Sequence, residues 1–124
     1  MRNIYFWTAI IWTAIIGVCC LISMKNFESA PIEGKYTDKL VHFTFYFTFT
    51  VLWFLALREK NIGKEALLRF KVFIGAVVFG IFIELFQSWF TADRSADVAD
   101  VIANSSGSAG AVLALWLAKN KLKQ

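Results

Sequence analysis

The feature that most constrains this chain is a series of four long apolar runs, separated by segments that carry its charged residues. The first run, residues 4–24, has 21 residues without a charged side chain. A helix of that length covers about 31 Å, enough to cross a hydrocarbon core of about 30 Å. Runs 40–57, 72–90 and 101–118 follow, and no repeat or linker divides them. We therefore expect an all-α fold: a single domain over residues 1–124 that is an integral membrane bundle of four transmembrane helices.

Composition supports this prediction. Hydrophobic residues make up 58% of the chain, against about 45–50% in soluble domains. The net charge of +4 comes from basic residues at the ends of the apolar runs, where they act as topology signals and attract lipid headgroups. No basic stripe is interleaved with aromatic residues, so we expect membrane lipids as partners and no nucleic acid. The five tryptophans lie mostly near span ends and are interpreted as interfacial anchors.

Lysine and arginine are distributed unevenly between the two sides of the predicted bundle. The N-terminus, the 58–71 loop and the C-terminal tail carry nine of them, whereas the 25–39 and 91–100 loops carry four. Because basic residues are enriched in cytoplasmic loops, both termini are predicted to be cytoplasmic and the other two loops to face outward.

The fourth run begins with small residues. Ala103, Gly107 and Ala111 are spaced by four, as are Ser106 and Gly110. Small residues at this spacing let neighbouring helix backbones approach closely. We therefore expect the fourth span to pack tightly inside the bundle.

Polar residues converge at the outer ends of the last three predicted spans. Residues three or four apart share a helix face. Each of the three segments contains polar residues at these spacings. The candidate functional cluster is Asp38, His42, Tyr46, Glu84, Gln87, Arg94, Asp97, Asp100 and Asn104.

Glu84 is the most costly member of this set, since it stands inside the third apolar run. A charged residue within a span costs roughly 2.5–3.5 kcal/mol on insertion scales and is usually turned into the bundle and paired. The candidate partners at its depth are His42, Arg94 and Asn104.

Simpler interpretations stay open beside a functional one. In these interpretations Glu84 forms a structural hydrogen bond or ion pair that fixes helix register. His42 caps the start of a helix. Three aspartates stand at predicted helix starts, where the N-terminal dipole favours an acidic side chain without any further role: Asp38, Asp97 and Asp100.

Three segments of the chain together resemble the VanZ-like family. Residues 38–46 fit the pattern D-K-x-x-H-F-x-x-Y, residues 84–87 fit E-x-x-Q, and residues 94–107 fit R-x-x-x-x-x-D-x-x-x-N-x-x-G. No single motif is rare, but the three in this order within four spans form a specific pattern. The resemblance implies a small multi-pass protein of the bacterial cytoplasmic (inner) membrane. The namesake of the family lowers susceptibility to the lipoglycopeptide teicoplanin without altering peptidoglycan precursors.

Three hypotheses follow for function. The leading one is a cell-envelope protein whose outer-leaflet polar cleft binds an envelope lipid or a lipidated glycopeptide and lowers teicoplanin susceptibility, with Arg94 holding a phosphate or carboxylate. The second is a membrane enzyme that uses the His/Glu/Asp cluster for hydrolysis or group transfer on a lipid-linked substrate. No nucleophile elbow or H-E-x-x-H motif supports it, and the sequence assigns no catalytic residue. The third is a scaffold or an ion-conducting bundle in which the cluster is purely structural.

The sequence predicts no cofactor and no bound metal. Nonetheless, a divalent ion could find oxygen and imidazole ligands in one set of residues: His42, Glu84, Asp97 and Asp100. Four thin spans enclose a small interior, so a homodimer is left open.

Overall fold

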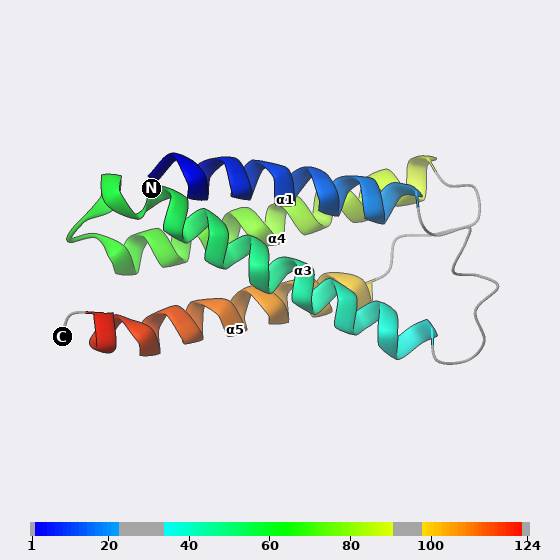
Figure 1. Cartoon of the computed structure of the whole chain (residues 1–124). Coiled ribbons are helices and arrows are strands. Elements are labelled where there is room, and N and C mark those ends of the chain that lie inside the picture. The colour runs from blue at the N-terminus through cyan, green and yellow to red at the C-terminus, as the bar shows by residue number, and fades with distance from the viewer. Residues whose placement is uncertain (1, 23–33, 91–97, 123–124) are drawn as a thin grey trace.

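The computed structural model describes residues 2–22, 34–90 and 98–122. Over these residues the chain forms α-helices α1 (Arg2–Ile22), α3 (Gly34–Leu57), α4 (Glu65–Phe90) and α5 (Val98–Leu122), with the 3-10 helix η1 (Arg58–Asn61) between α3 and α4. The four α-helices run alternately in opposite directions (Figure 1). The start of α1, η1 and the end of α5 therefore lie at one end of the bundle. The predicted all-α architecture with four helices is confirmed.

Three of the helices are long and apolar enough to cross a membrane. The corresponding stretches are Lys39–Asn61 in α3 and η1, Glu65–Trp89 in α4 and Val98–Lys119 in α5. The apolar part of α1, Ile4–Cys20, is shorter. These lengths agree with a membrane protein; that α1 also crosses the bilayer, and that the termini are cytoplasmic, stay predictions.

The helices extend beyond the predicted apolar runs, so two of the predicted loops are too long. The helix α4 begins at Glu65 rather than near residue 72, and Arg69 and Lys71 are therefore helical rather than part of a loop. The helix α3 begins at Gly34, which makes residues 34–39 helical as well. Hydropathy detects only the apolar part of a helix, whereas backbone hydrogen bonding continues through charged residues in the terminal turns.

The connection between α3 and α4 is short. The Asn61 side chain donates a hydrogen bond of 2.8 Å to the carbonyl of Leu57, the last residue of α3. Gly63 has a φ of 83°, in the left-handed region that glycine adopts without a steric penalty. The chain thereby reverses direction and α4 starts beside α3.

The helix α3 is the centre of the bundle, with its most extensive contacts to α5 and further contacts to α1 and α4. Two indole N–H groups join α1 to α3: Trp12 donates to the carbonyl of Phe45, and Trp53 donates to Thr13 Oγ1, each at 3.0 Å. A partly buried indole commonly takes such a hydrogen-bond partner, so these two tryptophans also hold α1 against α3; their role as interfacial anchors stays a prediction.

Candidate functional site

Three helices place an imidazole and two carboxylates beside one another. His42 comes from α3, Glu84 from α4 and Asp100 from α5, and one ligand atom of each lies within 4.8 Å of the others. The three side chains are buried, with 3%, 2% and 0% of their surface exposed. Because α3 and α5 begin where α4 ends (Figure 1), residues far apart in sequence reach the same depth. We call these three residues the ionisable trio.

A second polar layer lies one helical turn further into the bundle. Tyr46 is four residues from His42 and Asn104 is four from Asp100, so each shares a helix face with a trio residue. Both are buried and both meet α4 at Gly80. A β-carbon at Gly80 would lie 3.0 Å from Asn104 Nδ2 and 3.5 Å from Tyr46 Cε1. The absence of a side chain at Gly80 therefore leaves space for this layer.

A third layer continues the same faces of α3 and α5. Thr50 donates a hydrogen bond of 3.0 Å to the Ser108 hydroxyl, and both side chains are buried. Each hydroxyl is four residues further along its helix than the second layer. Polar side chains thus line the contact of α3 with α5 over three consecutive turns.

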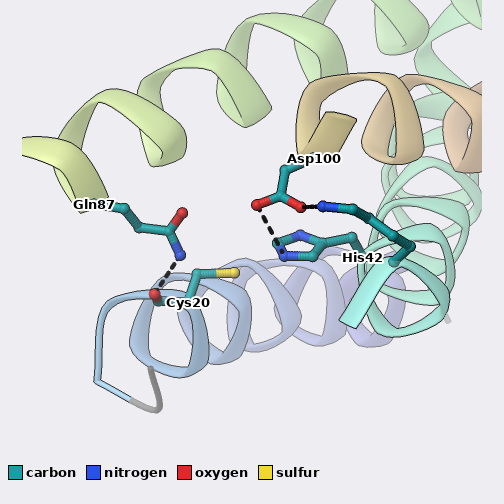
Figure 2. Close-up of polar contacts among 5 residues, drawn as sticks. Cys20, His42, Gln87 and Asp100 are labelled. Atoms are coloured by element: carbon teal, nitrogen blue, oxygen red, sulfur yellow. Dashed lines mark hydrogen bonds and ion pairs between the residues drawn. The ribbon is translucent and has the colours of Figure 1, made fainter. Parts of the chain in front are cut away.

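Asp100 is the centre of the first layer. Its Oδ1 accepts an ion-pair hydrogen bond from Lys39 Nζ, and its Oδ2 lies 3.9 Å from His42 Nε2 (Figure 2). Asp100 also stands in the first turn of α5, where the helix dipole stabilises a carboxylate. The Lys39 side chain is 31% exposed, so this pair connects the buried trio with the surface of the bundle.

The helix α1 closes the cluster from the remaining side. Gln87 lies one turn beyond Glu84 on α4, and its amide donates a hydrogen bond to the backbone carbonyl of Cys20 (Figure 2). Gln87 has 1% of its surface exposed. The amide therefore fixes α4 against α1 beside the trio.

The close approach of α3 and α5 depends on Gly107. A β-carbon at this position would overlap the backbone carbonyl oxygen of Phe43. Ala111, one turn further on, is fully buried. The predicted role of these two small residues is confirmed, whereas Ser106 of the second small-residue series is exposed. Since Phe43 adjoins His42, this contact also determines how near Asp100 comes to the imidazole.

The structure brings together six of the nine predicted site residues. These are His42, Tyr46, Glu84, Gln87, Asp100 and Asn104. Asp38 lies in α3, but its side chain is outside the described residues, as are Arg94 and Asp97. Of the candidate partners for Glu84, His42 is therefore a neighbour within the trio, while the position of Arg94 is not described.

Two residues of the site were missed by sequence reasoning. Lys39 belongs to the D-K-x-x-H-F-x-x-Y pattern but was not included among the candidate site residues, yet it pairs with Asp100; its position three residues before His42, on one helix face, was the available signal. Gly80 stands four residues before Glu84 and contacts the second layer. We define the polar cluster as Lys39 together with the six predicted residues, His42, Tyr46, Glu84, Gln87, Asp100 and Asn104.

The cluster retains unused hydrogen-bonding capacity. Among the described residues, the Tyr46 hydroxyl and both amide atoms of Asn104 have no hydrogen-bond partner. Buried polar atoms without partners are costly and are explained when a ligand or water supplies the missing bonds.

The trio also offers one nitrogen and two oxygen ligands to a divalent cation. Separations of up to 4.8 Å between ligand atoms fit metal–ligand distances of about 2.0–2.6 Å on either side of an ion. Three of the four candidate metal ligands named from the sequence are thus neighbours. The fourth, Asp97, lies outside the described residues.

Comparison with known proteins gives one match. The family model described as VanZ/LLP1 covers residues 5–120, nearly the entire chain. No curated protein matches the chain, and neither does any solved structure.

Proposed function

The chain belongs to the VanZ/LLP1 family, and we propose that its polar cluster binds the headgroup of an envelope amphiphile. The amphiphile is an envelope lipid or a lipidated glycopeptide, and its capture lowers susceptibility to teicoplanin. The observation that carries this proposal is the ionisable trio, which three separate helices assemble and bury.

The energetic cost of the trio supports a functional role. Two carboxylates and an imidazole stand at the ends of helices that are otherwise apolar enough to span a membrane. Ionisable residues in such segments are expensive, face the bundle interior and mark binding or transport sites. A purely structural bundle would reach the same helix packing with apolar side chains, because a buried ion pair contributes little net stability.

The chemistry of the cluster favours a headgroup rich in hydroxyl and amino groups. Glu84 and Asp100 accept hydrogen bonds, while the amide of Asn104 and the phenol of Tyr46 both donate and accept. The buried atoms of Asn104 and Tyr46 lack hydrogen-bond partners among the described residues. Sugar hydroxyls and amines would meet these requirements.

The surroundings of the cluster suit the apolar part of the same ligand. Phe43 and Phe47 stack with their ring centroids 6.2 Å apart, and Phe43 is exposed on α3 beside His42. Lys39, partly exposed, covers Asp100 from the surface. A headgroup that displaces Lys39 would reach the trio while its acyl chain lies along the phenylalanines.

Mass spectrometry of the intact, detergent-solubilised protein tests this binding. Wild-type protein, Glu84→Gln and Glu59→Gln are purified from bacterial membranes, and teicoplanin or vancomycin is then added to each. Glu59→Gln makes the same chemical change on η1, at the opposite end of the bundle.

We expect wild type and Glu59→Gln to retain a ligand mass that Glu84→Gln loses. Co-purified lipid identifies an envelope lipid as the ligand, whereas a complex with added teicoplanin identifies the drug. Identical spectra for all three proteins would contradict the proposal.

One geometric observation favours a second function, hydrolysis or group transfer on a lipid-linked substrate. The imidazole of His42 lies 3.9 Å from one carboxylate and within 4.8 Å of the other, an arrangement able to exchange protons or to hold an activating divalent ion. Incubation of the protein with extracted envelope lipids, with and without a chelator, tests it. Turnover that disappears on chelation and returns with Mg²⁺ or Mn²⁺ would support catalysis. A lipid profile unchanged by the protein would contradict it.

A further inference from the structure

A buried arginine stands at the opposite end of the bundle from the polar cluster. Arg69 lies on α4, one turn after the helix begins, and only 6% of its surface is exposed. It forms no hydrogen bond or ion pair with any other part of the chain that the structure describes. The guanidinium nitrogens are not among the fully buried polar atoms, so an anionic ligand can reach them, and a charge pair is strengthened where so little of the side chain meets water.

Arg69 borders two neighbouring cavities. The larger, of about 440 Å³, is lined by four basic side chains and one acidic side chain: Arg58, Lys64, Arg69, Lys119 and Glu65. The excess of positive charge makes this cavity complementary to an anion, even with Glu65 in its wall. Gly63 and apolar residues of α3, α4 and α5 form the rest of its lining.

The smaller cavity, of about 310 Å³, is almost entirely apolar. Its walls are Phe70 and Phe73 of α4 with Ala109 and Val112 of α5, and it shares Ala66 and Arg69 with the larger cavity. Phe70 is 61% exposed on the outside of the helix, on the surface that faces lipid when α4 spans a membrane. A basic hollow and an apolar hollow, both open to the surface of the bundle, therefore meet at Arg69.

We infer that this pair of cavities binds an anionic phospholipid. The phosphate pairs with Arg69 and is surrounded by Arg58, Lys64 and Lys119, and an acyl chain enters the space between α4 and α5. Guanidinium groups form paired hydrogen bonds with phosphate oxygens, and basic pockets between membrane helices are known to hold anionic headgroups. The inference is independent of the function proposed for the polar cluster, which lies at the other end of the bundle.

The test compares lipid retention by the full-length protein in intact-protein mass spectrometry. Wild type is equilibrated with phosphatidylglycerol, with phosphatidylcholine, or with phosphatidylglycerol plus excess inorganic phosphate. We expect phosphatidylglycerol to be retained in preference to phosphatidylcholine, and inorganic phosphate not to displace it, because the acyl chain contributes to binding. Loss of the lipid to inorganic phosphate would overturn the assignment in favour of a free-anion site. Equal retention of the two lipids would overturn it as well.

Arg69→Gln should lower phosphatidylglycerol retention roughly tenfold or more, as expected for one lost charge-assisted contact. Lys71→Gln is the matched control, since Lys71 lies on the same helix, is exposed and lines neither cavity. Equal retention by Arg69→Gln and wild type would contradict the inference, and so would equal losses in both variants. If Arg69→Gln does not fold, Lys119→Gln takes its place with the same expected direction. Glu84→Gln should retain the phospholipid normally, which separates this site from the polar cluster.

Discussion

Gly107 of α5 lies so close to the backbone carbonyl of Phe43 in α3 that a β-carbon at this position would overlap the oxygen. Backbone atoms cannot move aside as a flexible side chain can. The two helices must therefore separate to accommodate any other residue, and Asp100 would move away from His42 with them.

Gly107→Ala should consequently destabilise the protein by about 1–3 kcal/mol, the usual cost of overpacking. Gly75→Ala on α4 is the control, because a β-carbon there meets nothing within 4 Å and alanine favours a helix by roughly 0.5–1 kcal/mol over glycine. Thermal unfolding in detergent measures both. A Gly107→Ala variant as stable as Gly75→Ala would show that the helices do not pack as described.

The ion pair of Lys39 with Asp100 gives a second prediction. Lys39→Met leaves the fully buried carboxylate of Asp100 without its cation, and we expect a loss of about 3 kcal/mol, as for other broken buried pairs. Lys39→Met combined with Asp100→Asn should be more stable than Lys39→Met alone, because the amide carries no charge. The comparison is made by thermal unfolding of both variants. A double variant less stable than the single one would contradict the pairing.

The Thr50–Ser108 hydrogen bond should contribute far less. Both hydroxyls are buried, yet hydrogen bonds between membrane helices average only about 0.6 kcal/mol in double-mutant cycles. A cycle of Thr50→Val and Ser108→Ala should give a coupling energy near that value. Additive losses, with no coupling, would indicate that the two hydroxyls do not interact.

The sequence was sufficient to predict the helices and the depth of the polar residues. Apolar runs of about 17–25 residues identify spans directly, and residues four apart on a helix share a face. His42, Glu84 and Asp100 could therefore be placed at one level before their contact was visible. Gly107 was likewise identified from its spacing with neighbouring small residues.

The partners of these residues could not be predicted in the same way. Which face of α3 meets which face of α5 depends on helix rotation, which hydropathy does not report. Lys39 looked like a loop charge because the apolar run begins after it, although α3 begins at Gly34. Arg69 was assigned to a loop for the same reason, and its burial follows from α4 beginning at Glu65.

The most direct test of the central claim is teicoplanin and vancomycin susceptibility in a host expressing wild type, Glu84→Gln, Asp100→Asn or Glu59→Gln. Membrane levels are matched by immunoblot. We predict that wild type and Glu59→Gln raise the inhibitory concentration of teicoplanin but not of vancomycin, whereas both cluster variants behave like empty vector. Protection by Glu84→Gln and Asp100→Asn equal to that of wild type would contradict a role of the polar cluster in function.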